Sequence, residues 1–180
     1  MVTQLPITKR WARLGPNDPS WLIHVPDSGV CISAFVVCRR GKSILLGRPH
    51  AHDAWPTQGG FPRRHAAALE KVGTWILPAT HLKMWESPQR GAIRITREWA
   101  GLKGKPHFIM VQSHLRRART AKKGGGEKHW DICFVYEMTA RTLPRLKPWW
   151  SQMRFVEPKD IRRIKVGRGH KDILREAGFI

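Results

Sequence analysis

One stretch of the chain, Glu86–Leu102 (ESPQRGAIRITREWAGL), carries signals for a helix with two defined ends. Ser87 is a residue type that caps helix N-termini, and Pro88 suits the first helical position. Gly101 is the residue type that most often ends a helix. The sequence therefore predicts a helix from about residue 88 to residue 100, and everything else in the fold must pack around it.

One face of this helix is apolar at two of three positions. Ile95, Glu98 and Trp99 are spaced i, i+3 and i+4, so they share that face. An isoleucine and a tryptophan on either side of a single carboxylate predict a packing surface. Arg94 and Glu98 are also four residues apart, which favours an ion pair that stabilises the helix.

The spacing of these residues resembles the Nudix signature, G-x5-E-x7-R-E-U-x-E-E-x-G-U, in which U is an apolar residue. The positions that keep the pattern are Glu86, Arg94, Glu98, Gly101 and Leu102. Other positions depart from it, and among them Thr80 replaces the first glycine, Ile95 one glutamate and Trp99 another. The resemblance implies the Nudix fold, an α/β/α sandwich with a mixed β-sheet, and a chain similar to archaeal members of that superfamily with a degenerate signature.

In the family this resemblance implies, carboxylates on the helix face hold Mg²⁺ or Mn²⁺ against a diphosphate. Hard cations need several oxygen ligands, and one carboxylate is a poor magnesium site. The family's Pro-Gly-Gly loop is replaced by Pro78-Ala79-Thr80, which lacks the freedom of glycine at positive φ. We therefore predict a catalytically silent protein with no cofactor, in which Glu86, Arg94 and Glu98 are vestigial.

Two alternatives remain open from the sequence. The first is an active, Mg²⁺-dependent Nudix hydrolase that cleaves a nucleoside diphosphate linked to another group. In that case Glu98 is a metal ligand and a carboxylate elsewhere completes the site. The substitutes available are Glu70, Glu127, Asp131 and Glu137. The second alternative is a regulator that uses the old pocket to sense a nucleotide or sugar ligand.

The charge of the chain predicts its partner. It has 33 Lys and Arg against 13 Asp and Glu, a formal net charge of +20 and a pI near 11.2, while 41% hydrophobic residues suffice for a core. Such an excess favours polyanions. No sequence-reading motif is present, so we predict phosphate contacts with structured RNA, and specifically with ribosomal RNA in a ribosome, next to ribosomal proteins. Nudix-like domains in mitochondrial large ribosomal subunits supply a precedent by analogy alone.

The cations that we expect to contact RNA form local clusters along the chain. They are Lys9, Arg10 and Arg13 in an N-terminal arm; Arg39, Arg40 and Lys42 in a hairpin; Arg63 and Arg64; Arg116, Arg117, Arg119, Lys122 and Lys123 in a glycine-tipped loop; and Arg162, Arg163, Lys165 and Arg168 near the C-terminus. Tryptophans next to basic residues can stack on unpaired bases, and Trp11 and Trp149 are the candidates.

The remaining features bound the organisation of the chain. We expect a basic, proline-containing arm over residues 1–28 and one domain over residues 29–180, with an inserted segment at 48–72 and a short strand at 73–78. The three cysteines contain no Cys-x2-Cys pair, which predicts buried thiols. No signal peptide or membrane-spanning run is evident, so we expect a cytoplasmic protein without a membrane partner.

Overall fold

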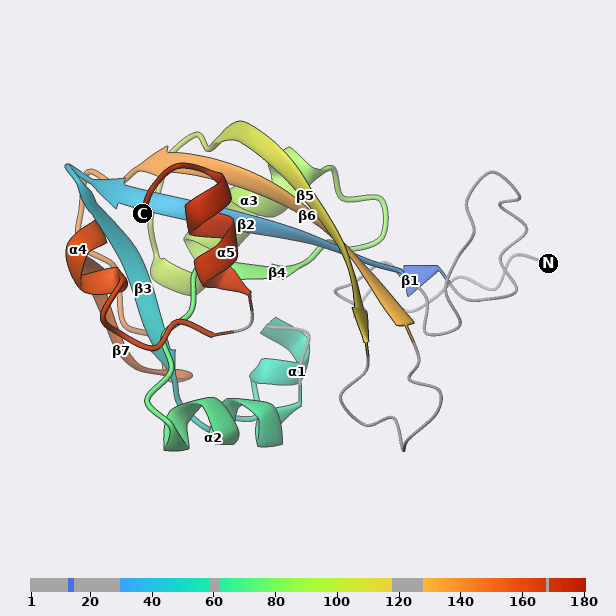
Figure 1. The fold of residues 1–180 in the computed structure, drawn as a ribbon, viewed down its shortest axis with the longest axis horizontal. Helices are drawn as coiled ribbons and strands as arrows, with labels where there is room; N and C mark the ends of the chain where they lie inside the picture. The colour runs from blue at the N-terminus through green and yellow to red at the C-terminus, as the bar shows by residue number, and fades with distance from the viewer. Residues whose placement is uncertain (1–12, 15–29, 59–61, 118–127, 168) are drawn as a thin grey trace.

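The computed structural model describes residues 13–14, 30–58, 62–117, 128–167 and 169–180 (Figure 1). In chain order the elements are β1 (Arg13–Leu14), β2 (Val30–Arg40), β3 (Ser43–Pro49), α1 (Trp55–Gln58), α2 (Arg63–Lys71), β4 (Ala79–His81), α3 (Pro88–Ala100), β5 (His107–Arg117), β6 (Lys128–Thr139), β7 (Trp150–Val156), α4 (Pro158–Ile161) and α5 (His170–Glu176). Of the predicted N-terminal arm, only β1 lies within the described residues.

The strands form one mixed sheet in the order β5-β6-β2-β3-β7, with β1 and β4 also paired to β2. The β2–β6 pairing is parallel, and the other pairings are antiparallel. The predicted basic hairpin joins β2 to β3, and its tight turn contains Gly41 at φ +60°. Only the first residues of β3 pair with β2, because β3 then turns away to pair along its length with β7.

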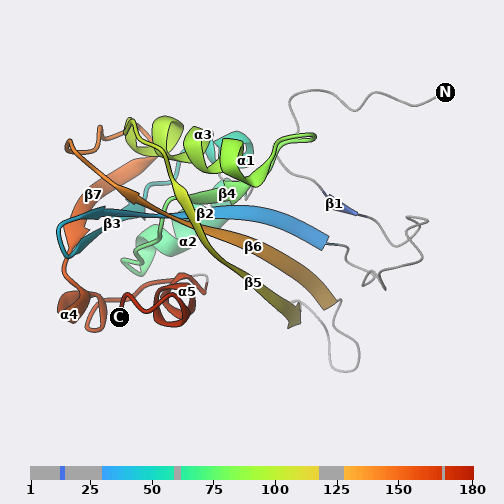
Figure 2. The same cartoon turned by 90° about the horizontal axis from the view of Figure 1, so that it is seen from above.

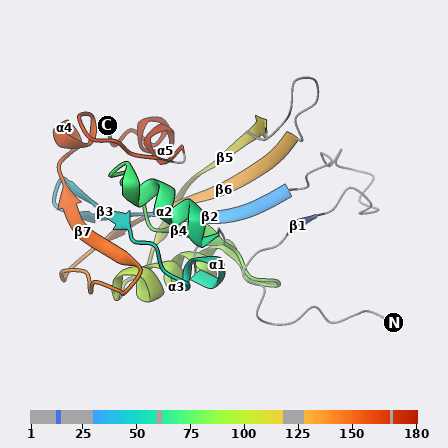
Figure 3. The same ribbon diagram turned by 90° about the horizontal axis from the view of Figure 1, so that it is seen from below.

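Helices cover both faces of this sheet, which confirms the predicted α/β/α sandwich. Figures 2 and 3 show α1 and α3 on one side and α4 and α5 on the other. Alternate residues of β2 point to opposite faces. Ala34 and Val36 join the core cluster that contains α3, whereas Phe35 and Val37 join the cluster that contains α4 and α5. A central strand buried on both faces explains the apolar run that the sequence shows there.

The prediction of a strand over residues 73–78 is wrong. Ile76 forms an isolated bridge to Gly47, and the neighbouring Trp75 forms one to Val166. Because this segment changes partner from one residue to the next, no continuous ladder develops. The strand lies just after it, at β4, where Thr80 pairs with Ala34 of β2.

Two further predictions concern cysteines and membranes. Cys31, Cys38 and Cys133 are all buried and free, as predicted. Burial raises the pKa of the Cys38 thiol to about 12, so this thiol stays protonated. Within the described ranges, no helix is both long enough and apolar enough to cross a membrane.

Candidate functional site

The helix α3 begins and ends where the sequence predicts. Pro88 is its first residue, and the Ser87 hydroxyl caps it by accepting a hydrogen bond from the backbone N–H of Arg90 at 3.3 Å. At the other end Gly101 adopts the left-handed conformation, with φ 65°, that stops the helix. These local signals fix which side chains the helix presents to the sheet.

A buried ion pair ties the loop before α3 to the helix. Arg94 donates from Nε and Nη2 to the two carboxylate oxygens of Glu86, at 2.7 and 2.6 Å. The same Nη2 also donates to the backbone oxygen of His81 at 3.1 Å. Arg94 is only 6% exposed, and Glu86 accepts a further bond from the Lys83 N–H at 2.9 Å. The predicted pair with Glu98 is looser, at 3.7 Å, so Glu86 is the principal partner of Arg94.

The environment of Glu86 keeps it ionised. Burial acts to raise its pKa, but the hydrogen bonds from Arg94 and from the Lys83 N–H, together with the charges of these two residues, outweigh burial and lower the pKa. From the sequence, Glu98 was the expected ion-pair partner of Arg94, and no contact between Glu86 and Arg94 was predicted. Their eight-residue separation across a loop and a helix start was the one signal that could have suggested a clamp.

The face of α3 that carries Ile95 and Trp99 packs in the core and is closed to solvent. Both side chains are fully buried. Trp99 contacts Trp55 and Trp150 edge to face, with ring centroids 5.5 and 5.1 Å apart, and Trp55 and Trp150 lie 5.1 Å from each other. Edge-to-face contacts of this kind are favourable beyond the area they bury. We call these three residues the tryptophan cluster.

Hydrogen bonds and a glycine hold the tryptophan cluster in place. The Trp150 indole donates to the backbone oxygen of Trp99 at 3.0 Å, and the Trp55 indole donates to that of His50 at 2.7 Å. Gly47 of β3 gives the Trp150 ring its space, because a Cβ there would lie 2.6 Å from a ring carbon. Since α1 lies within the segment 48–72, the predicted insertion supplies Trp55 and so covers this face of α3.

Comparison with solved structures identifies the architecture. The MutT protein from Methanosarcina mazei matches with a TM-score of 0.58 and 16% identity, covering 86% of this chain and 95% of that one. The MutT NUDIX hydrolase from Burkholderia pseudomallei matches with a TM-score of 0.56 and 17% identity, covering 81% and 96%. The NUDIX domain of Shewanella oneidensis NrtR, solved with ADP ribose, matches with a TM-score of 0.55 and 14% identity, covering 82% and 84%.

The chain has the Nudix fold. No family model matches the sequence, and no curated protein matches it significantly. The likeness is therefore one of structure, at identities that establish the fold alone.

The residues at the site do not fit the divalent cation that the Nudix fold implies. Of the three helix positions 95, 98 and 99, only Glu98 carries an oxygen ligand, and its side chain is 26% exposed. Within the part of the chain that the structure describes, no group of three or more His, Cys, Asp or Glu residues could hold a metal ion. Magnesium needs several oxygen ligands in a defined geometry, and a single carboxylate on this helix face does not supply them.

Two of the substitute carboxylates proposed for the alternative, Glu70 and Glu137, have other partners. Glu70 accepts from His50 Nδ1 at 2.7 Å and from the Ala51 N–H at 2.8 Å, and the bond from His50 is the main cause of its lowered pKa. Glu137 pairs with Arg39 at 2.8 Å. Asp131 lies in β6, and Glu127 lies outside the described residues.

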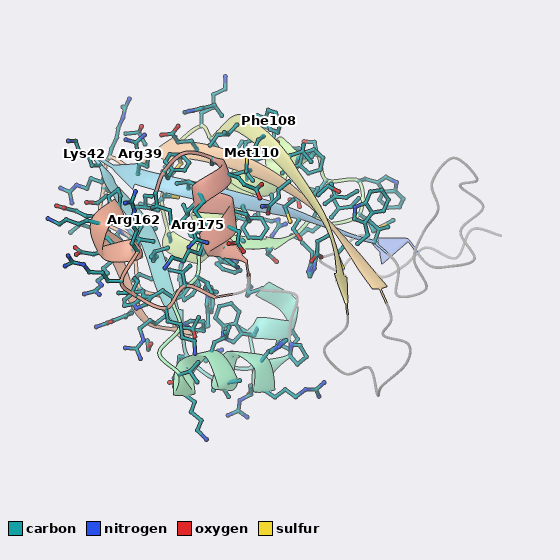
Figure 4. All side chains as sticks on the ribbon, viewed as in Figure 1. Arg39, Lys42, Phe108, Met110, Arg162 and Arg175 are labelled. Carbon is teal, nitrogen blue, oxygen red and sulfur yellow. The ribbon has the colours of Figure 1, made fainter. Side chains whose placement is uncertain are left out.

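The structure brings some of the predicted RNA-contacting cations together and separates others. The hairpin residues Arg39 and Lys42 lie at the same end of the molecule as Arg162 and the C-terminal helices (Figure 4). The Arg39 guanidinium sits 5.6 Å from the centre of the Phe179 ring, which links the hairpin to the C-terminus. Arg40, Arg163 and Lys165 are exposed in the same two segments.

The other cations lie elsewhere. Arg63, paired with Asp53 at 3.4 Å, and Arg64 begin α2. Arg116 and Arg117 belong to β5 and not to the loop predicted for them, at the end of the sheet opposite α4 (Figures 1 and 3). Arg13 lies in β1. The remaining predicted residues lie outside the described part of the chain: Lys9, Arg10, Trp11, Arg119, Lys122, Lys123 and Arg168.

Among the described tryptophans, the exposed one is Trp85, which was not a predicted stacking residue. Trp149, a predicted stacking residue, is partly buried against the core cluster that contains α3. Trp85, just before α3, is 87% exposed and has a positive φ of 58°, rare for a bulky residue. Residue type and basic neighbours did not separate these two positions, because exposure depends on tertiary packing.

Proposed function

We propose that this chain is a catalytically silent Nudix-fold protein that binds structured RNA, as a component of a ribosome or a factor associated with one, in the cytoplasm. The observation that carries the proposal is the tryptophan cluster. Trp99 occupies a position where the Nudix pattern has a carboxylate, and its ring is locked between two other indoles. A face closed in this way supports packing and not the binding of a diphosphate.

The charge of the folded domain supports RNA as the partner. Of the 33 Lys and Arg, only six lie outside the described residues, so the positive excess belongs mainly to the folded domain. Cations spread over several elements suit contacts to a phosphate backbone, which fix position without reading bases. The folded domain would then hold these cations in a fixed geometry.

Sedimentation of the native protein from a cell lysate through a sucrose gradient tests this proposal. We expect the protein to migrate with a ribosomal subunit, to stay with it through a high-salt wash and to be released by RNase. Migration as a free small protein in untreated lysate would refute the proposal.

The active-hydrolase alternative requires a second measurement. Purified protein is incubated with Mg²⁺ and a panel of nucleoside diphosphate derivatives, and release of phosphate or nucleoside monophosphate is measured. We expect no turnover, and Glu98→Gln to leave RNA binding unchanged. Turnover by the wild type that Glu98→Gln abolishes would establish the alternative. Because the similar NrtR domain was solved with ADP ribose, a rise in melting temperature with ADP-ribose, without turnover, would instead indicate a ligand sensor.

A further inference from the structure

A hollow of about 990 Å³ lies at the C-terminal end of α3, away from the tryptophan cluster. It lies between the connection from α3 to β5 and the chain that follows β6. Figure 1 shows that β6 ends beside the start of β5 in this part of the sheet. We call it the loop hollow. Its four lysines and arginines are Lys103, Lys105, Arg141 and Arg145.

Two glycines shape the loop hollow. Gly101 has no Cβ, and the Cβ, Cγ and Cδ atoms of Arg145 lie 3.0–3.2 Å from where one would be. The Arg145 N–H also donates to the backbone oxygen of Ala100 at 2.7 Å. Both the backbone of Arg145 and the stem of its side chain are therefore held against the end of α3. Gly104 lies against the buried Met138 side chain, which lines the hollow.

The four cations around the loop hollow pair with no carboxylate of the described residues, although Glu137 contacts His107, which also lines the hollow, at 3.4 Å. Within the described ranges, none of the four forms an ion pair, and the hollow is lined by no aspartate or glutamate. Other cations of the fold are paired: Arg39 with Glu137, for example, at 2.8 Å. Four uncompensated charges around one concavity concentrate a positive potential there.

The end of α3 does not cancel this potential. Helix C-termini carry partial negative charge through carbonyl oxygens that lack partners. Here the carbonyl of Arg97 accepts from the Gly101 N–H, that of Trp99 from the Trp150 indole and that of Ala100 from the Arg145 N–H. Three of the last four carbonyls of the helix are therefore engaged, which weakens the negative potential that opposes the cations at the hollow.

We infer that the loop hollow binds consecutive phosphate groups of an RNA strand. This inference rests on the proposed function and gives it a specific site, built from cations that the sequence analysis did not select. Lys and Arg donate charge-assisted hydrogen bonds to phosphate oxygens, and the hydroxyls of Thr139 and Thr142 add neutral donors. Leu143, 65% exposed beside them, offers an apolar surface against which a ribose or base can lie.

The test compares two triple variants that remove the same charge. Lys103→Gln/Lys105→Gln/Arg141→Gln changes the hollow but keeps Arg145, whose stem packs on the helix end. The control variant removes three exposed cations that do not line the hollow: Lys71→Gln, Arg90→Gln and Arg97→Gln. Binding of a fluorescein-labelled RNA hairpin is measured by anisotropy across a range of salt concentrations. The melting temperature of each variant confirms that it folds.

We expect the hollow variant to bind RNA about tenfold or more weakly, with a salt slope reduced by about 2–3, since each lost phosphate contact lowers the slope by about 0.7–0.9. The control variant should change the slope by less than about 1. Thr142→Glu, which adds a carboxylate at the hollow and removes no cation, should also weaken binding.

Several results would overturn the inference. Equal salt slopes for the two triple variants would show that the positive charge of the whole surface, and not the loop hollow, contacts RNA. That result would leave the proposed RNA-binding function standing. Saturable binding of ADP that requires Arg141, with an unchanged RNA slope, would assign the hollow to a free nucleotide. Displacement of RNA by poly-glutamate at equal charge would indicate an acidic protein. A wild-type protein that does not bind the hairpin would overturn the proposed function and this inference together.

Discussion

Gly47→Ala adds a single methyl group and should destabilise the fold, because that group would displace the Trp150 ring of the tryptophan cluster. A Cβ on this residue would lie 2.6 and 2.7 Å from Cζ3 and Cε3 of Trp150. Carbon atoms pack at about 3.5–4.0 Å, so the ring must withdraw by about 1 Å. It cannot do so freely, because its indole N–H is bonded to Trp99 and its other side meets Trp55.

The expected cost follows from this overlap. Overpacking a closed core typically costs about 1–3 kcal/mol. In a chain of 180 residues, about 1 kcal/mol lowers the melting temperature by about 2–4 °C. Gly47→Ala should therefore lower it by about 2–12 °C. At a glycine without such a contact and with φ open to alanine, the same change stabilises by about 0.4–1 kcal/mol, so the sign of the effect is itself diagnostic.

A double-mutant cycle measured by urea unfolding isolates the contact. Trp150→Ala alone should cost about 3–5 kcal/mol. In that background Gly47→Ala has no ring to displace and should be neutral or slightly stabilising, so the two effects should not add. A rise in stability from Gly47→Ala alone, or additive effects in the cycle, would show that Gly47 does not serve to seat the Trp150 ring.

Three further outcomes follow from α3. Glu86→Gln should lower the free energy of unfolding by about 3 kcal/mol, because it leaves the buried Arg94 charge without its principal partner. Urea unfolding of this variant measures the loss, and a change of less than about 1 kcal/mol would count against a stabilising role for the Glu86–Arg94 pair, the clamp. Because the pKa of Glu86 is lowered in the folded protein, the stability that the ionised carboxylate contributes is present above the ordinary glutamate pKa and is lost as the pH falls through the lowered value. Wild-type stability should therefore drop in acid more steeply than that of Glu86→Gln, as urea titrations at several pH values would show. Trp99→Glu, which introduces the carboxylate of the Nudix pattern, should produce no hydrolysis. It should lower the free energy of unfolding by about 4 kcal/mol or more, since it opens a cavity and buries an unpaired charge. A folded variant with Mg²⁺-dependent turnover would contradict this prediction.

The features of α3 that could be predicted are those with local causes. Ser87, Pro88 and Gly101 act on the few backbone groups next to them, so the sequence places both helix ends correctly. The apolar face at Ile95 and Trp99 was also predictable, because helical spacing alone puts the two residues together.

What could not be predicted depends on contacts between distant segments. Trp55, Trp99 and Trp150 are separated by about fifty residues along the chain, and nothing local indicates that they meet. Residues 73–78 carry the composition of a strand, yet the pairing partners come from two different parts of the chain. The loop hollow joins two connections whose approach is set by the sheet order, so its four cations could not be distinguished from the others by sequence.

The residues of the Nudix pattern that this chain keeps are mostly those with a structural task in its own fold. Glu86 and Arg94 form the clamp, and Gly101 makes the left-handed stop. Leu102 is buried in the core cluster that contains α3. The carboxylate positions at 95 and 99 hold apolar side chains that fill the same core. Losing the clamp or the stop would destabilise the domain, and apolar side chains at positions 95 and 99 suit a core in which unpaired carboxylates would be costly.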